Sequence, residues 1–400
     1  MDVLQQLVTE ANTKLVLLVM DGLGGLPHPD TGKTELETAR TPNLDRLARS
    51  SSVGLHTPVA PGITPGSGPG HLGLFGYDPV QHEVGRGVLS ALGVGIELKP
   101  EDVACRVNFA TMENGVITDR RAGRIPTEEC ARLCKKLESI RIPGVQIIIQ
   151  PEMQYRAVIV FRGEGLGADL TDTDPQKTGL APLPVRARSD DPASRRTAEL
   201  FNEFVRQANM VLAEERPANT ILLRGFDRLP KLATFREKYG LNSAVIAVYP
   251  MYRGLARLVG MEVLTPGHSI EEEFEVLENN WEKYDFFFVH VKPTDSAGED
   301  GAFDRKVQVI EEVDALIPRI EALNPDVLVV TGDHSTPAVL KAHSWHPVPI
   351  LLVSRYARRN AWVEKFGESD CARGALGFIK STDILPLMLA HGLRLQKFGA

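Results

Sequence analysis

The chain contains a strand-length apolar run that ends abruptly on an acidic residue. Residues 15–20 read Leu-Val-Leu-Leu-Val-Met, and Asp21 follows with the glycine-rich segment Gly22-Leu23-Gly24-Gly25. A continuous apolar run of this length is typical of a strand that is buried on both faces, as in a parallel sheet covered by helices. Similar runs, separated by helical patterns, occupy residues 286–291, 327–330 and 350–353. The pattern predicts an α/β fold with a mostly parallel sheet flanked by helices.

A second region interrupts this alternation. Residues 104–109 and 115–119 predict two short strands, a helix begins near Thr127, and two more strands follow at 145–150 and 155–162. Residues 163–194 have a loop-like composition. Because 400 residues exceed what one ordinary core holds, we expect a smaller inserted α+β domain. We place the insertion at 81–189 and the discontinuous core at 1–80 and 190–400, where a helix over 197–213 and a strand over 220–224 would resume the alternation.

Composition narrows the class of protein. Hydrophobic residues make up 43% of the chain and charged residues 24%, which is typical of a globular protein. A net charge of −7 argues against nucleic acid or a membrane as partner. We expect a cytoplasmic protein, because the N-terminus lacks a leader pattern and no apolar run is long enough to span a membrane. The sequence indicates no oligomeric state. The four cysteines do not form a zinc pattern, and Cys130 and Cys134 are expected to face a core.

A single serine lies among glycines and prolines in the segment Gly66-Ser67-Gly68-Pro69-Gly70. Glycine allows backbone amides to approach a ligand closely, and the N-terminus of a helix stabilises negative charge. The segment has the pattern of a loop at the start of a helix. Taken alone it is compatible with a solvated turn. Taken with its surroundings it is the candidate nucleophile loop.

Polar residues follow the predicted strands at several places. Asp21 ends the first strand, Asp295 and Glu299 follow the strand ending at residue 291, and Asp333 and His334 follow the strand ending at residue 330. In open α/β sheets ligands collect at the carboxyl ends of the strands. Each residue alone is compatible with a turn or a cap. Together with the serine they predict a site for two divalent cations of the kind used in phosphoryl transfer, with Mn²⁺, Zn²⁺ or Mg²⁺ as candidates.

Several motifs resemble those of the alkaline phosphatase superfamily. They are Asp21-Gly-Leu-Gly-Gly25, Thr41-Pro-Asn-Leu-Asp45, Gly66-Ser-Gly-Pro-Gly-His71, Thr331-Gly-Asp-His-Ser335 and His343-Ser-Trp-His-Pro-Val-Pro349. Within the superfamily the chain is similar to the archaeal-type, 2,3-bisphosphoglycerate-independent phosphoglycerate mutases over nearly its whole length. The resemblance implies an alkaline-phosphatase-like core with an inserted substrate-binding domain and two divalent metal ions. It also implies a small phosphorylated substrate, phosphoglycerate, which is interconverted between its 3- and 2-phospho forms through a phosphoserine.

The resemblance also implies roles for individual residues. Ser67 would be the nucleophile. One metal would be surrounded by Asp21, Ser67, Asp333 and His334, and the other by Asp295, Glu299 and His343. At the position of Glu299 the family more usually has histidine, and a carboxylate there favours Mn²⁺ or Mg²⁺ over Zn²⁺. Asp300 or His346 are alternative ligands.

Basic residues are the candidate substrate contacts. Arg120, Arg121 and Arg124 lie within five residues, and guanidinium groups pair with both the carboxylate and the phosphate of phosphoglycerate. The family binds substrate with a similar cluster, although a solvated basic turn is the alternative. Arg253 is a further candidate phosphate contact. His71 would share a helix face with Ser67 and either help to bind the phosphorylated group or pack in the core.

Two other functions remain compatible with these residues. One keeps the fold and the metals but changes the substrate, as in a phosphohydrolase or a homoserine kinase-like phosphotransferase. The other is a binding protein without catalysis. The combination of Ser67, Asp21, Asp333 and His334 argues against the second.

Overall fold

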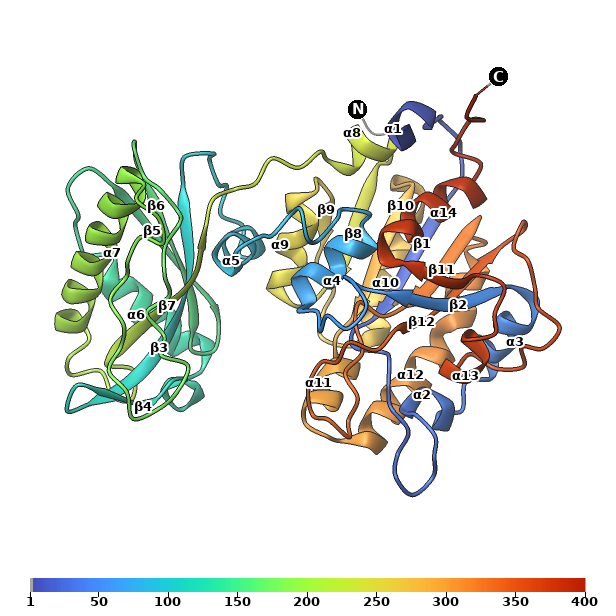
Figure 1. Ribbon diagram of the computed structural model, residues 1–400, viewed down its shortest axis with the longest axis horizontal. Coiled ribbons are helices and arrows are strands. Elements are labelled where there is room, and N and C mark those ends of the chain that lie inside the picture. Colours follow the sequence, from blue (N-terminus) through green and yellow to red (C-terminus); the bar gives the residue numbers. More distant parts are fainter. Residues whose placement is uncertain (1–2, 400) are drawn as a thin grey trace. The chain divides into compact units, whose positions relative to one another are not determined.

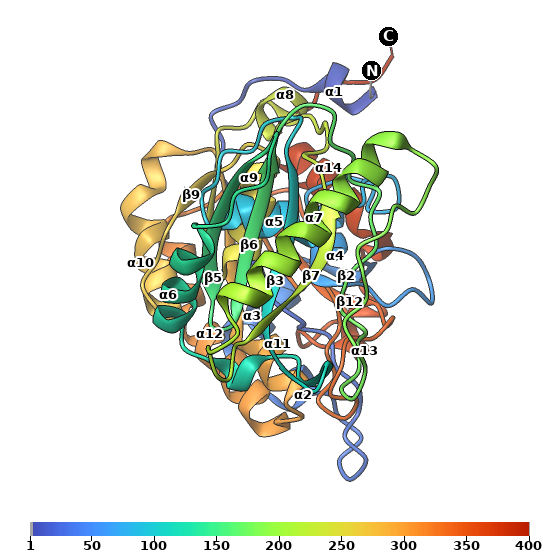
Figure 2. The same ribbon diagram turned by 90° about the vertical axis from the view of Figure 1, so that its left-hand side faces the viewer.

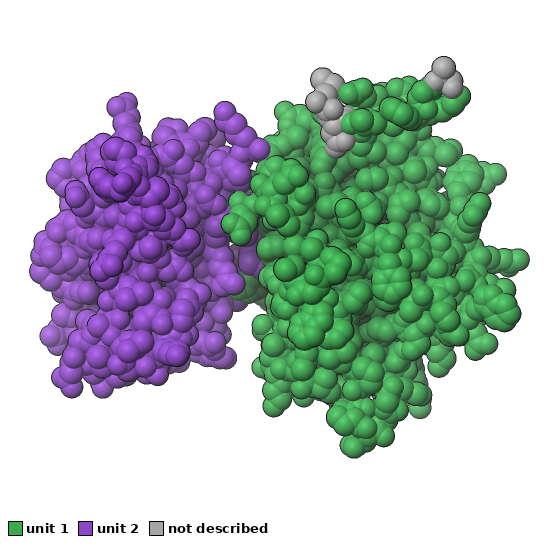
Figure 3. Space-filling view, in the orientation of Figure 1, with its two compact units in different colours: residues 1–83, 232–249, 255–400 green, residues 84–231, 250–254 purple. Residues whose placement is uncertain are grey.

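The computed structural model describes residues 3–399, and the chain divides into two compact units (Figure 3). Unit 1 comprises residues 1–83, 232–249 and 255–400, and unit 2 comprises residues 84–231 and 250–254. Each unit has its own sheet and its own apolar core.

Unit 1 is built on an eight-stranded sheet with the order β13-β2-β12-β11-β1-β10-β8-β9 (Figure 1). Strand β12 pairs antiparallel with both of its neighbours, and the other pairs are parallel. The mostly parallel α/β sheet predicted from the apolar runs is therefore confirmed. The strands are β1 (Leu15–Met20), β2 (Ser52–Thr57), β8 (Ser243–Ala247), β9 (Glu262–Leu264), β10 (Phe286–Val291), β11 (Val327–Thr331), β12 (Val348–Ser354) and β13 (Gly377–Lys380).

Helices cover both faces of this sheet. On one face Val16, Leu18 and Met20 of β1 join a core with apolar residues of α2 (Glu35–Thr38), α3 (Pro42–Ser50), α10 (Ile270–Asn280) and α12 (Phe303–Ala322). On the other face lie α4 (Ser67–Leu74), α8 (Phe235–Tyr239) and α14 (Ile384–His391). There Phe288 of β10 contacts Phe75, which caps α4, at 5.0 Å between ring centroids. Because both faces are packed, the central strands are almost entirely apolar, with His290 and Thr331 as the polar residues near the carboxyl ends of β10 and β11.

Local sequence sets the starts of these helices. Thr34 and Ser269 form capping boxes with the glutamates three residues further on, at the starts of α2 and α10. Pro42 occupies the first turn of α3, where its missing N–H costs nothing. The remaining helical segments of unit 1 are α1 (Val3–Leu7), η2 (Trp281–Lys283), α11 (Pro293–Glu299), α13 (Glu368–Cys371) and η3 (Ser381–Asp383). Helix α9 (Pro250–Leu258) begins in unit 2 and continues in unit 1.

The register of three neighbouring strands decides where the polar residues lie. Strand β1 is between β10 and β11, with Met20 opposite Val291 and Val19 opposite Thr331. All three strands run in the same direction, so their carboxyl ends meet at one edge of the sheet. The segments that follow them begin with Asp21, Lys292 and Gly332. This edge holds the candidate site.

Unit 2 is a smaller α+β fold in which all strand pairs are antiparallel. Strand β3 pairs with β4, β6 and β7, and β5 pairs with β6. Helices α6 and α7 lie over one face of this sheet (Figure 2), and α5 packs on β3, β6 and β7. The elements are α5 (Arg86–Gly93), β3 (Val103–Glu113), β4 (Val116–Asp119), η1 (Ala122–Arg124), α6 (Thr127–Leu137), β5 (Gln146–Met153), β6 (Arg156–Arg162), α7 (Pro192–Val211) and β7 (Thr220–Asp227).

The boundary of the small domain differs from the one expected at residue 189. The sequence pattern predicts that the helix over 197–213 and the strand over 220–224 belong to the large domain, because a helix followed by a strand continues its alternation. In the structure β7 pairs antiparallel with β3, and α7 buries Phe201 and Phe204 in the core of unit 2. The correction has a simple cause: a helix–strand pattern does not say which sheet the strand joins.

Two smaller expectations concern cysteines and membranes. Cys130 and Cys134 are buried on α6 in the core of unit 2, as the helical spacing predicted. Over residues 3–399, no helix combines the length and the apolar character needed to cross a bilayer.

Candidate active site

Ser67 is the first residue of α4, with Gly66 as the preceding cap residue. The predicted position of the serine at the start of a helix is therefore confirmed. The helix lies directly against the segment after β11, because a Cβ atom at Gly70 would come within 2.6 Å of the Asp333 carbonyl oxygen. A larger residue at position 70 would push the helix away. The glycine thus allows Ser67 Oγ to approach His334 Nε2 to 3.5 Å.

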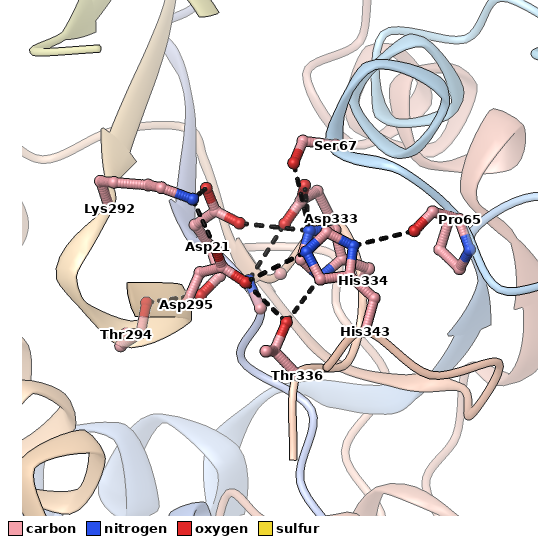
Figure 4. Close-up of polar contacts among 12 residues, drawn as sticks. Asp21, Pro65, Ser67, Lys292, Thr294, Asp295, Asp333, His334, Thr336 and His343 are labelled. Carbon is pink, nitrogen blue, oxygen red and sulfur yellow. Dashed lines mark hydrogen bonds and ion pairs between the residues drawn. The ribbon is translucent and has the colours of Figure 1, made fainter. Parts of the chain in front are cut away.

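Three buried side chains lie beside the serine. Asp21, Asp333 and His334 each offer one atom, and these atoms lie within 4.8 Å of one another. We call them the inner group. His334 Nε2 is 3.4 Å from Asp21 Oδ1 and 3.2 Å from Asp333 Oδ2 (Figure 4). All three side chains are fully buried, so their charges interact with little screening by water.

Neighbouring lysine and histidine side chains keep the acids of the inner group ionised. Burial acts to raise the pKa of Asp21, but Lys292 and His290 outweigh it and hold that pKa well below its usual range. The pKa of Asp333 is also lowered: burial and Asp21 oppose this shift, and His334 and His71 cause it. Burial is the largest cause of the lowered pKa of His334. At neutral pH the inner group therefore combines two carboxylates with a neutral imidazole.

A second set of side chains shares His334. Asp295, His334 and His343 also offer atoms within 4.8 Å of one another, and we call them the outer group. His343 Nε2 is 3.5 Å from Asp295 Oδ1 and 3.6 Å from Glu299 Oε1. The rings of His334 and His343 stack at 3.7 Å between centroids. Asp295 and Glu299 both lie on α11, one helical turn apart.

The outer group is more open to solvent than the inner group. The side chain of Glu299 is 56% exposed and that of His343 19%, whereas Asp295 is 1% exposed. Burial acts to lower the pKa of His343. Contacts with Glu299, the Pro65 carbonyl oxygen and Asp295 outweigh burial and raise that pKa to about 9. His343 is therefore protonated at neutral pH in the protein without a bound cation.

Sequence reasoning did not find all residues of the site. Lys292 Nζ lies 3.0 Å from Asp21 Oδ2 and 2.5 Å from Asp295 Oδ2, so it links the two groups. His290 Nε2 is 3.2 Å from Asp21 Oδ2. Lys292 directly follows β10, so the search for polar residues at the ends of strands, which located Asp21, could have found it. Thr336 was missed as well, and the sequence carries no signal for its contacts.

His71 has a different environment from the one predicted for a substrate-binding residue. Its ring is fully buried, with Nδ1 at 3.0 Å from Asp333 Oδ2 and 2.8 Å from the Ser67 carbonyl oxygen. The ring also lies 5.5 Å from that of Phe288. Of the two roles predicted for His71, this burial favours packing in the core over a contact to the substrate, and the ring supports Asp333.

The alternative ligands Asp300 and His346 belong to neither group among the described residues. Asp300 is exposed at the end of α11. His346 Nδ1 lies 3.0 Å from Ser344 Oγ, and its ring stacks on Trp345.

The predicted substrate arginines belong to unit 2, whereas the inner and outer groups belong to unit 1. Arg120 forms a bidentate pair with Asp174, at 2.8 and 2.7 Å. Arg121 and Arg124 are exposed at the turn after β4, and Arg253 is partly buried in the first turns of α9. Arg106, also in unit 2, lies on β3 with Nε at 3.7 Å from Glu152 Oε2.

The chemistry of the donors fits divalent cations. Carboxylate oxygens and imidazole nitrogens converge in both groups. Mn²⁺, Zn²⁺ and Mg²⁺ bind such donors, and they differ in their preference for oxygen or nitrogen ligands. The inner group contains two carboxylates and a neutral imidazole, all of them buried, with Ser67 Oγ beside them. A bound cation would stabilise this arrangement.

Comparisons with known proteins agree on one family. A family model described as 2,3-bisphosphoglycerate-independent phosphoglycerate mutase matches residues 48–219. A probable enzyme of that name from Thermotoga neapolitana is 55% identical over 99% of this chain and 98% of its own length. Another from Aquifex aeolicus is 52% identical over the full length of both chains. Both of these relatives carry the mutase name, which supports the main functional prediction and not the kinase-like or phosphatase alternative.

Solved structures give the same result for the fold. The PH0037 protein from Pyrococcus horikoshii superposes with a TM-score of 0.84 at 33% identity, covering 97% of this chain and 99% of its own. A cofactor-independent phosphoglycerate mutase from Thermoplasma acidophilum superposes with a TM-score of 0.72 at 30% identity, covering 95% of this chain and 100% of its own.

Proposed function

This chain belongs to the family of 2,3-bisphosphoglycerate-independent phosphoglycerate mutases, and we propose that it interconverts 3-phosphoglycerate and 2-phosphoglycerate with Ser67 as the nucleophile. The observation that carries the proposal is the position of Ser67 Oγ, 3.5 Å from His334 Nε2 at the start of α4. A nucleophile next to buried ligands and a helix N-terminus is suited to form and stabilise a phosphoserine.

The reaction requires two transfers of the same phosphoryl group. Ser67 Oγ attacks the phosphorus of 3-phosphoglycerate, a bond from phosphorus to the serine forms, and the bond to the 3-oxygen breaks. The serine hydroxyl loses its proton and the departing oxygen takes one up, which leaves phosphoserine and glycerate. The 2-hydroxyl of glycerate then attacks the phosphoserine and restores Ser67. Water must be kept out between the two transfers, because it would hydrolyse the phosphoserine.

The proposed cation sites are the inner group together with Ser67, and Asp295 and His343 of the outer group together with Glu299. Asp21, Ser67, Asp333 and His334 would hold one divalent cation, and Asp295, Glu299 and His343 the other. When bound, the two cations would lower the pKa of the serine hydroxyl and offset the negative charge of the phosphoryl group. The carboxylate of Glu299 adds an oxygen donor and favours Mn²⁺ or Mg²⁺.

Side chains of the protein perform the remaining tasks. Lys292 keeps Asp21 ionised and places a positive charge between the two groups. The first N–H groups of α4 point toward the serine end of the helix, where they stabilise negative charge on the phosphoserine. Arg120, Arg121, Arg124 and Arg253 are the proposed partners of the carboxylate and phosphate of the substrate. A cytoplasmic location stays a prediction.

An assay of the purified protein tests the proposal. Conversion of 3-phosphoglycerate to 2-phosphoglycerate is measured without 2,3-bisphosphoglycerate, after removal of metal and after addition of Mn²⁺, Zn²⁺ or Mg²⁺. We expect activity only with metal, and we expect Ser67→Ala to abolish it. Mass spectrometry of the trapped wild-type protein should locate a phosphate on Ser67.

Ser296→Ala is the matched control, because Ser296 is an exposed serine on α11 next to Asp295. It should retain wild-type activity. Metal-loaded wild-type protein that does not convert 3-phosphoglycerate would refute the mutase proposal. Full activity of Ser67→Ala would refute the role of the serine.

A further inference from the structure

The hydroxyl group of Thr336 lies between the inner and outer groups. Its Oγ1 is 2.7 Å from Asp295 Oδ1 and 2.9 Å from His334 Nδ1 (Figure 4). Asp295 belongs to the outer group, and His334 belongs to both. Thr336 itself is fully buried and is not a member of either group. It therefore contacts one residue of each group.

The number of available hydrogens fixes the direction of these two hydrogen bonds. A threonine hydroxyl has one hydrogen, and a carboxylate oxygen only accepts. The hydroxyl therefore donates to Asp295 Oδ1 and accepts from His334 Nδ1–H. His334 is then the tautomer with an unprotonated Nε2. That nitrogen faces Asp21 Oδ1 at 3.4 Å and Asp333 Oδ2 at 3.2 Å, as a ligand nitrogen must.

The position of Thr336 is itself tightly held. Lys306, which is fully buried on α12, donates from Nζ to the carbonyl oxygens of Thr336, Gly22 and Gly24 at 2.9, 2.9 and 3.1 Å. The backbone N–H of Thr336 lies 3.2 Å from the Gly22 carbonyl oxygen and 3.0 Å from that of Gly24. Gly22 has a φ of +64°, and a Cβ atom there would come within 2.5 Å of Thr336 Oγ1. The hydroxyl therefore has little freedom to move.

From this geometry we propose that Thr336 is a positioning residue that orients His334 and Asp295 together and thereby couples cation binding at the inner and outer groups. The proposal rests on the proposed function of these groups as cation sites. Partners behind metal ligands set the tautomer and orientation of an imidazole, and here one hydroxyl contacts both a histidine of the inner site and an aspartate of the outer site. Lys306 contributes by holding the loops after β1 and β11 in place.

Two variants separate the hydroxyl from the shape of the side chain. Thr336→Val keeps the size of the side chain and removes the hydroxyl, whereas Thr336→Ser keeps the hydroxyl. Calorimetric titration of the metal-free, full-length proteins with Mn²⁺ measures the affinity. We expect Thr336→Val to bind Mn²⁺ about 10- to 100-fold more weakly than the wild type, with both binding events affected, and Thr336→Ser to stay near the wild type. Equal affinity of the valine variant and the wild type would overturn the proposal.

A second readout does not depend on metal or on the valine variant. Nitrogen-15 spectra of histidine-labelled, metal-free wild-type protein report which nitrogen of each neutral imidazole carries the proton. We expect the His334 signal, assigned with His334→Gln, to show protonated Nδ1 in the wild type and in Thr336→Ser. Protonation at Nε2 in the wild type would contradict the assigned direction of the hydrogen bonds.

These results are distinguishable from failure of the proposed function. If the wild type binds Mn²⁺ but does not convert 3-phosphoglycerate, the mutase proposal fails, and weaker binding by Thr336→Val still supports the role of Thr336. If the wild type is an active mutase and the valine variant binds Mn²⁺ normally, the role of Thr336 fails and the mutase proposal remains.

Discussion

The inner and outer groups share His334 but differ in burial and in charge state. The inner group is fully buried, and its imidazole is neutral. Lys292 and His290 hold Asp21 ionised, and the pKa of Asp333 is also lowered. The outer group includes His343, whose pKa is raised to about 9, and lies beside the exposed carboxylate of Glu299. The inner group is therefore ready to bind a cation at neutral pH, whereas the outer group must first lose a proton. One sheet edge thus holds a preformed site and a site that responds to pH.

The inner group should carry the larger share of catalysis, because it contacts the nucleophile. We expect Asp333→Asn to lower kcat on the order of a thousandfold, since it removes a carboxylate next to Ser67 and a partner of His334. Steady-state kinetics at saturating Mn²⁺ measures the loss. Asp300→Asn, which changes an exposed acid outside both groups, is the control. Equal losses of kcat in Asp333→Asn and Asp300→Asn would contradict a special role of the inner group in catalysis.

Substitutions in the outer group should lower activity, but by less than substitutions in the inner group. We expect His343→Ala to lower activity on the order of a hundredfold and to regain part of it at high Mn²⁺ concentration, because the proposed ligands Asp295 and Glu299 remain. His346→Ala is the matched control, since this histidine is three residues away and belongs to neither group. A larger effect of His346→Ala than of His343→Ala would show that the ligand has been misidentified.

The raised pKa of His343 predicts a difference in pH dependence between the two groups. Below about pH 9 a cation must displace the proton of His343, so the affinity of the outer group should rise by up to about tenfold for each pH unit until that pH is reached. The inner group contains a neutral imidazole and should show a much flatter dependence. Mn²⁺ titrations by calorimetry in buffers of different ionisation enthalpy count the protons released. Equal proton release at both sites would contradict the comparison.

The smallest effect is expected at Glu299. Its side chain is largely exposed and lies 3.6 Å from His343 Nε2, so Glu299→Gln should weaken Mn²⁺ binding by about fivefold at most. The same change removes the strongest contact that raises the pKa of His343, so the rise in affinity with pH should end at a lower pH. Titrations of this variant over the same pH range measure both effects. A loss as large as that of His343→Ala would contradict the minor contribution expected of Glu299 to cation binding.

Much of the site followed from a simple sequence pattern. An apolar run that ends on a polar residue marks the carboxyl end of a buried strand, and parallel neighbours bring such ends together. Asp21, Asp295, Asp333 and His334 converge for this reason, since β1 lies between β10 and β11. The start of a helix at Ser67 also followed from local residues, because Gly66 and Pro69 favour such a turn and cap. The position of each residue at the end of a strand or the start of a helix depends on neighbours in the sequence, and the parallel pairing of the strands then brings these ends together.

Other features depend on contacts that the sequence does not encode locally. The membership of α7 and β7 in unit 2 was decided by the pairing of β7 with β3, which lies about a hundred residues earlier in the chain. The orientation of the His71 side chain is set by its contacts with Asp333 and Phe288, which bury the imidazole ring. Helical spacing placed His71 near Ser67 but did not say which of the two would face solvent.

The sequence by itself determined that this is an α/β protein with acids and imidazoles at one sheet edge beside a glycine-flanked serine. Strand periodicity and helix caps are local properties, so they can be read from short segments. Only the tertiary structure decided that Lys292 and Thr336 link the two groups and that His334 belongs to both. Those contacts depend on side-chain orientations fixed by the packing of β1, β10 and β11 and the loops that follow them, which no single segment specifies.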